Sequence, residues 1–182
     1  SVKAGPGGAG LVQYTLPAFA EGVAINATYD SAGENNEGST ALGLVYTGIE
    51  GLTVSLGTGN DNSTAAVDAD YTTMKASYVY GSITAAVSAS EYDHTTAAND
   101  QEVKSWGLSY TVTDDISISY GQETIENNTD TADIDVDGIT ASYTSGGMTV
   151  TAKSLSADNV DGSSTGVNND NTMFKLAASF AF

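Results

Sequence analysis

The acidic stretch Asp133-Ile-Asp-Val-Asp-Gly138 is the part of this sequence that comes nearest to a metal-binding motif. Its D-x-D-x-D-G spacing matches the opening of a calcium loop, in which alternate carboxylates supply hard oxygen ligands. The twelfth position of such a loop carries a bidentate acid, but here it falls on Thr144, which cannot replace one. Asp133, Asp135 and Asp137 are therefore a candidate calcium site without its closing ligand. The same pattern also fits a strand end with alternating acids, and diffuse cation binding over the acidic loops is favoured over a specific site.

Three lysines suggest a different role, which is the electrostatic selection of charged solutes. Lys75, Lys153 and Lys175 each occupy the polar phase of an alternating segment, five to seven residues from its aromatic or methionine end. At roughly 3.3 Å per residue, less the effect of tilt, all three reach the middle of a membrane-thick wall. Charged side chains that line a channel set its ion selectivity. The lysines are interpreted either as a basic pore wall or as scattered charges in the lumen, and the sequence leaves both interpretations open.

Catalytic chemistry has little support in the sequence. His94 is the single histidine, and it lies in an acidic stretch, Glu91-Tyr-Asp-His-Thr95, where a solvated side chain is the ordinary outcome. No GxSxG, HExxH or phosphate-loop motif is present. The absence of cysteine excludes disulfides and thiolate metal sites. We therefore expect no enzymatic activity and no cofactor other than loosely bound Ca²⁺.

Charge and composition narrow the class of protein further. The 182 residues contain 23 Asp and Glu against five Lys and no Arg, for a net charge of -18. Such a chain does not bind nucleic acid, whose phosphates require cations. No run of eighteen apolar residues predicts a membrane-spanning helix. Twenty Gly, two Pro and many Ser, Thr, Asn and Asp residues indicate β-strands joined by turns.

The elements that would position these residues are strands. The last one alternates strictly, with Phe174, Leu176, Ala178, Phe180 and Phe182 on one face. A soluble domain rarely ends on an exposed Phe-x-Phe edge, whereas such a strand is stable when its apolar face meets lipid. Alternation of this kind recurs and predicts eleven strands, near residues 10–16, 23–29, 42–46, 52–56, 73–80, 82–90, 105–110, 116–120, 139–143, 148–153 and 174–182.

The connections alternate in length as the strands succeed one another. Short ones fall near 17–21, 48–51, 81, 113–115 and 145–147, and long ones at 30–39, 59–70, 91–102, 123–138 and 158–171. Nineteen of the 23 acidic residues lie in or beside the long connections. Short turns at one end and long loops at the other are typical of an outer-membrane barrel.

Aromatic residues support the same arrangement. Tyr14, Tyr46, Tyr80, Tyr110 and Tyr143 stand on the apolar phase close to the short turns. We place another group nearer the long-loop end, and it consists of Tyr29, Tyr71 and Tyr120. Two aromatic belts are expected at the two boundaries of a membrane, because these side chains combine an apolar body with a polar tip.

With these features in place, the sequence resembles the general diffusion porins of Gram-negative outer membranes. The resemblance rests on strand rhythm, turns, the terminal Phe182 and the stretch Leu11–Tyr29, which is similar to the strand pair after that family's constriction loop. It implies an all-β fold, a transmembrane antiparallel β-barrel, of which this chain is the C-terminal portion of sixteen strands. Residues 1–9 would be the Gly-rich end of the constriction loop, and residues 10–182 the barrel strands. A smaller barrel of ten or twelve strands is the alternative, since bacterial barrels close on even numbers.

The resemblance also implies a function. Porins are water-filled pores for passive diffusion of small hydrophilic solutes and ions, and they sit as homotrimers in a bilayer with lipopolysaccharide. The acidic loops predict that this one prefers cations. The alternative function is an acidic β-rich structural or adhesive protein of the cell surface. That alternative explains the low Pro content and acidic loops, but not the terminal Phe182 or the heights of the tyrosines.

Overall fold

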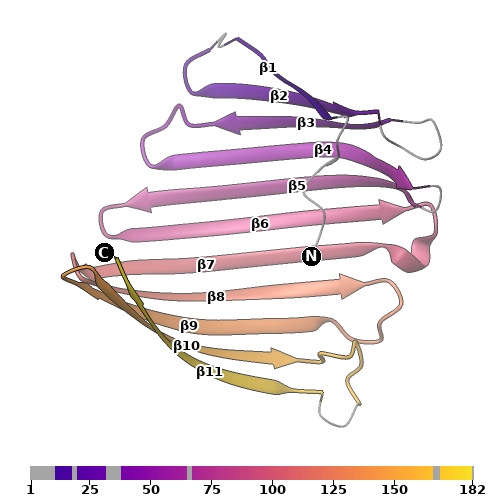
Figure 1. Ribbon diagram of the computed structural model, residues 1–182. Helices are drawn as coiled ribbons and strands as arrows, with labels where there is room; N and C mark the ends of the chain where they lie inside the picture. The colour runs from indigo at the N-terminus through magenta and orange to yellow at the C-terminus, as the bar shows by residue number, and fades with distance from the viewer. Residues whose placement is uncertain (1–10, 18–19, 32–37, 65–66, 166–168, 182) are drawn as a thin grey trace.

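The computed structural model describes residues 11–17, 20–31, 38–64, 67–165 and 169–181 of the chain. Within them, eleven strands form one antiparallel sheet in which each strand pairs with the next along the chain (Figure 1). The prediction of eleven successive strands is confirmed. The strands are β1 (Leu11–Thr15), β2 (Val23–Asp30), β3 (Ser39–Tyr46), β4 (Leu52–Thr64), β5 (Val67–Tyr80), β6 (Ile83–His94), β7 (Gln101–Thr113), β8 (Ile116–Asn127), β9 (Ile134–Ser145), β10 (Met148–Asp158) and β11 (Asn171–Phe180).

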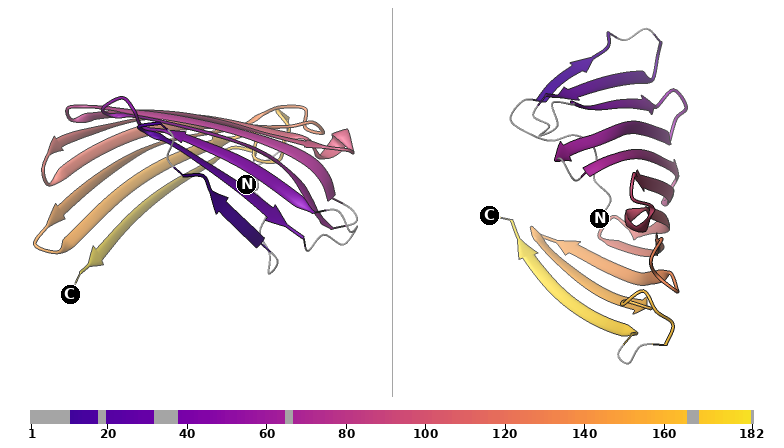
Figure 2. Two further views of the ribbon diagram at one scale, coloured as in Figure 1. Left: turned by 90° about the horizontal axis from the view of Figure 1, so that it is seen from above. Right: turned by 90° about the vertical axis from the view of Figure 1, so that its right-hand side faces the viewer.

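The sheet is bent into an open trough, with β1 and β11 at its two rims (Figure 2). Every residue of these two strands is exposed, and neither has a second neighbour among the described residues. An open rim presents a row of unpaired backbone N–H and C=O groups, which water can solvate and lipid cannot.

The two faces of the sheet differ in chemistry along every strand. In β7, Trp106, Leu108 and Tyr110 are exposed, while the intervening Ser105 and Gly107 are half-buried. Side chains on the concave side of a curved sheet crowd together and lose exposure, so the small polar residues occupy the concave face. We call this the inner face, and the convex apolar side the outer face.

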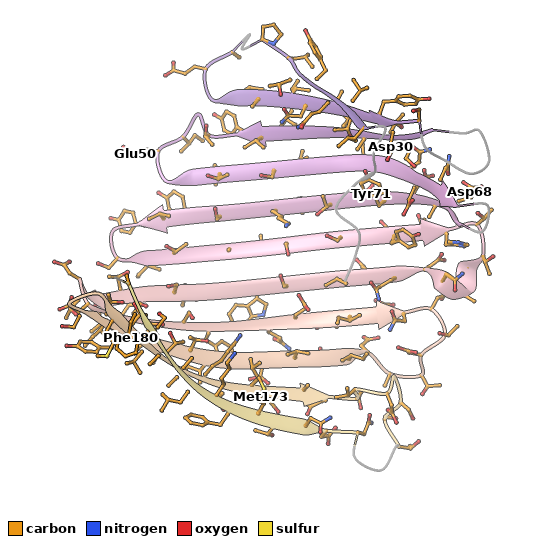
Figure 3. All side chains as sticks on the ribbon, viewed as in Figure 1. Asp30, Glu50, Asp68, Tyr71, Met173 and Phe180 are labelled. Atoms are coloured by element: carbon orange, nitrogen blue, oxygen red, sulfur yellow. The ribbon has the colours of Figure 1, made fainter. Side chains whose placement is uncertain are left out.

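Tight turns join the strands at one end of the sheet. The connection between β9 and β10 is Gly146-Gly147, and both residues have positive φ, at 56° and 85°. Paired positive φ values are required by the two-residue turns whose twist matches that of a hairpin. Glu50 marks this short-turn end in Figure 3, and Asp30 and Asp68 mark the opposite, long-loop end.

At the long-loop end β4 to β9 extend farther than predicted, so three of the predicted long connections are too long. The predicted connection at 59–70 is mostly strand, since β4 continues to Thr64 and β5 begins at Val67. The predicted connections at 91–102 and 123–138 are shortened in the same way, and the first retains a 3-10 turn at Ala97–Asn99. Backbone pairing continues into polar residues here, whereas apolar alternation stops where contact with lipid would stop.

A one-layer sheet has little interior, and the structure reflects this. No described large side chain is completely buried. Among the described residues, no helix combines the length and the apolar character needed to cross a membrane. The few buried side chains gather mainly at the long-loop end of β2 to β5, and they are Asp30, Ser39, Asp61, Asn62, Ala69 and Tyr71, with Asn169 elsewhere.

Candidate functional site

Hydroxyl groups line the inner face as cross-strand pairs. The hydroxyls of Thr73 and Ser90 lie 2.9 Å apart across β5 and β6, and those of Ser88 and Ser105 lie 2.8 Å apart across β6 and β7. Further along the sheet, Thr144 and Thr149 repeat the contact at 3.0 Å. Each hydroxyl both donates and accepts, so such pairs keep spare capacity for water. The inner face is therefore a surface that water wets.

The three lysines of the predicted pore wall all belong to the inner phase of their strands. Lys153 of β10 and Lys175 of β11 are direct cross-strand partners, while Lys75 of β5 stands opposite Ser88. The structure thus brings two of the three together and leaves the third on a distant strand. None of the three forms an ion pair with a described residue, whereas Lys104 of the outer phase bonds Glu102 at 2.7 Å.

A shallow hollow interrupts the inner face between β6 and β10. Its floor is Gly107, Gly121 and Gly138, which pair in one row across β7, β8 and β9. The hollow holds about 530 Å³, and Glu123 and Lys153 both contribute to its lining. At Gly138 the absence of a side chain leaves room for Leu155, which a Cβ there would overlap.

The three residues of the candidate calcium site lie at the long-loop end of β9. Asp135 and Asp137 lie in β9, and Asp133 directly precedes it. The Thr124 hydroxyl donates to Asp135 at 2.6 Å, and the Tyr120 hydroxyl donates to Asp137 at 3.4 Å. Extended backbone separates alternate residues such as Asp135 and Asp137 by about 7 Å. In the described part of the chain, no three carboxylate or imidazole groups are placed to hold one metal ion.

His94 has a structural role in its loop. Its backbone N–H donates to Asp100 at 2.8 Å, and its Nδ1 accepts the Thr96 backbone N–H at 2.8 Å. Its ring centroid lies 6.4 Å from that of Tyr92. These contacts order the turn between β6 and β7.

Two of the three tyrosines predicted to form the aromatic belt near the long-loop end do not belong to it. Tyr120 is only the fifth residue of β8 from the short-turn end, and its ring lies 5.5 Å from that of Trp106 on the outer face. Tyr71 lies near the long-loop end as expected, but it is out of phase with Tyr78 and belongs to the inner face, so it is not part of a lipid-facing belt. Its position in the alternation of β5 is the signal that could have identified it.

Tyr71 belongs to a buried polar group that the sequence alone did not indicate. We call this group the mouth cluster, and it lies at the long-loop end of β2 to β5, where Figure 3 labels Asp30 and Tyr71. Tyr71 and Gly59 are cross-strand partners, and a Cβ at Gly59 would overlap the Tyr71 ring and hydroxyl. Burial of polar groups in a wall that otherwise buries almost nothing distinguishes this end of the sheet. The members of the mouth cluster are Asp30, Ser39, Asp61, Asn62 and Tyr71.

Comparison with known proteins gives a consistent result. The model of one family, described as Gram-negative porin, matches residues 3–182. No curated protein sequence matches the chain. Among solved structures, a porin refined at 1.8 Å resolution is similar with a TM-score of 0.68 and 18% identity over 94% of this chain. In-vitro folded OmpT, an outer membrane protein of Vibrio cholerae, is similar with a TM-score of 0.66 and 22% identity over 93%.

An anion-selective porin from Comamonas acidovorans is similar with a TM-score of 0.64 and 14% identity over 92% of this chain. The present chain spans 61% of the first of these structures, 63% of the second and 55% of the third. These likenesses show that the sheet has the fold of a porin barrel wall over part of its circumference.

Proposed function

Because the chain belongs to the Gram-negative porin family, we propose that it forms part of the wall of a water-filled pore. Small hydrophilic solutes and ions cross this pore by passive diffusion, without catalysis and without a cofactor. The family locates the chain in the outer membrane of a Gram-negative bacterium.

The separation of the two faces is the observation that supports this function most directly. Apolar side chains such as Leu108 and Ile118 stand exposed on the outer face, where a bilayer would cover them. The inner face presents paired hydroxyls, glycines and lysines, which suit a water-filled lumen. An acidic surface protein, the second function that the sequence allowed, would have no use for an exposed apolar belt, since such belts associate in water.

The open trough must be closed before it can work as a pore. We propose that further strands pair with the open edges of β1 and β11 and so close the complete barrel, as expected for a sixteen-stranded porin. The longer chains of the solved porins support this proposal. The suggested role of residues 1–9 as the end of a constriction loop lies outside the described residues and stays part of the proposal.

We further propose that the pore prefers cations and that Lys75, Lys153 and Lys175 moderate this preference. The chain has a formal net charge of -18, and most of its 23 acidic residues lie toward the long-loop end, where they would concentrate cations before these enter. Three uncompensated lysines on the inner face oppose this effect inside the lumen. Trimerisation is proposed by analogy with OmpT of Vibrio cholerae, for which a trimer form is known. The outer face would contact the bilayer and lipopolysaccharide.

Single-channel recording of the purified full-length protein in planar bilayers tests this function. We expect stepwise conductance and a reversal potential of cation-selective sign in a KCl gradient. The double variant K153E/K175E should raise the cation preference and keep the conductance. S109T, a neutral change on the same face, serves as the control. A protein that remains soluble and monodisperse without detergent, and forms no channels, would contradict the pore and favour the surface protein.

A further inference from the structure

Two large apolar side chains stand on the inner face beside the Lys153–Lys175 pair. Leu155 of β10 and Met173 of β11 are direct cross-strand partners, each two residues from a lysine and in the same phase of its strand. Leu155 is half-buried and Met173, labelled in Figure 3, is 48% exposed. We call these four residues the amphipathic block. A wall that only has to be wetted, like the hydroxyl-lined part of the inner face, does not require its apolar half.

The apolar surface continues from the block toward the long-loop end. Val136 of β9 is two residues beyond Gly138, the cross-strand partner of Leu155, and both Val136 and Leu155 line the hollow of about 530 Å³ described above. Beyond Val136, a further row of inner-phase apolar residues crosses β7, β8 and β9, and its members are Val103, Ile125 and Ile134. The hollow is therefore bordered by lysine on the short-turn side and by apolar side chains on the long-loop side.

The lysine pair lacks a counter-charge in the described part of the chain. Lys153 and Lys175 are directly opposed, and like charges in this position destabilise a sheet. An anion bound beside both ammonium groups would remove that repulsion. Thr140 of β9 is the partner of Lys153 on its other side and lines the hollow with it, so its hydroxyl can donate a further hydrogen bond to the same anion.

We propose that the hollow and the amphipathic block bind small organic carboxylates that carry an apolar body, such as an aromatic ring. The carboxylate lies at Lys153, Lys175 and the Thr140 hydroxyl, and the apolar body lies over Leu155. Glu123 favours this orientation, because it lines the hollow on the long-loop side of the glycine row and repels a carboxylate there. Binding follows from the wall alone, whereas a role in selective passage rests on the proposed pore.

The chain contains a natural counterpart that lacks the apolar half. A second hollow of about 530 Å³ includes Lys75 of β5 in its lining. Apart from Lys75, Ala86 and Gly107, its inner-phase lining consists of hydroxyl residues, which are Thr53, Ser55, Ser77, Ser88 and Ser105. This second hollow offers a cation to an anion but no large apolar side chain to an apolar body. It should therefore not distinguish between carboxylates that differ only in their apolar part.

Three ligands separate the two halves of the proposed site. Phenylacetate has both the charge and the ring, acetate has only the charge, and phenethyl alcohol has only the ring. Shielding about 60 Å² of apolar ligand surface corresponds to about tenfold in affinity, so phenylacetate should bind about tenfold more tightly than acetate. It should exceed phenethyl alcohol by at least about tenfold, because hydrogen bonds to charged groups are the stronger ones. A ligand of this size on an open wall should have a millimolar dissociation constant.

Saturation-transfer NMR titrations on the full-length protein in dodecyl maltoside measure these weak affinities, with protein-free micelles as the blank. K153Q/K175Q should weaken the binding of both phenylacetate and acetate by about tenfold, because it removes the charge from the site. L155T/M173Q should weaken phenylacetate about tenfold and leave acetate within about twofold, because it removes only the apolar half. K75Q is the matched control and should preserve the preference for phenylacetate. Circular dichroism verifies the fold of each variant.

Single-channel recording then separates this site from the proposed pore. Phenylacetate should briefly interrupt the current through the unmodified protein, and L155T/M173Q should abolish these interruptions. Selective binding in a protein that forms no channels would support the site and contradict the pore. Channels in a protein that does not prefer phenylacetate over acetate would overturn the site, and would mean that another part of the complete barrel covers the apolar surface. Equal loss of the preference in K75Q would also overturn it, since binding would then follow overall charge.

Discussion

Reversing one charge at the Lys153–Lys175 pair should make the protein more stable. The two lysines are direct partners across β10 and β11, so their ammonium groups share one face of the sheet. Like charges in this position destabilise a sheet, whereas opposite charges stabilise it by roughly 0.2–1 kcal/mol. K175E replaces a pair of opposed like charges with a pair of opposite charges. The substitution should therefore increase the free energy of unfolding even as it changes the pore wall.

The magnitude follows from Coulomb's law in a wet environment. Directly opposed residues have Cβ atoms about 5 Å apart, and flexible side chains let like charges separate to about 6 Å or more. At that distance in water the repulsion is about 0.7 kcal/mol, and an attraction of similar size replaces it. Holding two long side chains in one geometry costs part of this gain. The net increase in unfolding free energy should be about 1 kcal/mol.

Urea unfolding in lipid vesicles, followed by Trp106 fluorescence, measures this difference. K75E is the matched control, because Lys75 stands opposite the uncharged Ser88 and should gain nothing of this kind. The gain for K175E should shrink in 1 M KCl, where the screening length falls to about 3 Å. If K175E is no more stable than the unmodified protein at low salt, or if K75E gains equally, the lysines are not opposed as described.

Two further predictions test other parts of the wall. L108R should destabilise the protein in bilayers by about 1–3 kcal/mol, because Leu108 faces lipid between the Tyr110 belt and the midplane, whereas S109R on the opposite face should cost far less. Equal costs in urea unfolding would contradict the two faces. G107L should reduce single-channel conductance by filling the hollow, and it should fold, because a Cβ there would meet only the Tyr120 carbonyl oxygen at 3.6 Å; unchanged conductance would mean that the hollow lies outside the ion path.

Much of the fold could be predicted because the period of two carries the information directly. Trp106, Leu108 and Tyr110 fix the outer phase of β7, and tight turns such as Gly146-Gly147 make each strand the neighbour of the next. Strand number, order and face follow from these two facts. The direct opposition of Lys153 and Lys175 could not be predicted in the same way. It depends on the register across the connection between β10 and β11, and alternation alone does not set that register.

The mouth cluster escaped prediction for a different physical reason. Apolar alternation reports where side chains would meet lipid, so it ends before the strands do, and residues 59–70 looked like a loop. Backbone pairing carries β4 and β5 several residues farther, which brings Asp61 and Tyr71 into the sheet. Their proximity to Asp30 requires three successive registers, and the sequence shows none of them.

The contrast between most of the sheet and the mouth cluster identifies where the stability of this fold should depend on buried polar contacts. Along most of the sheet, lipid would cover the outer face and water would wet the inner face, so no described side chain there has to be buried without solvent. At the mouth, Asp30 and Asp61 are buried together with Asn62. Carboxylates in such surroundings are stable only while opposite charge or hydrogen bonds compensate for the lost water. Loss of the groups that compensate Asp30 and Asp61 should therefore destabilise the long-loop ends of β2 and β4 more than loss of a polar contact elsewhere in the sheet.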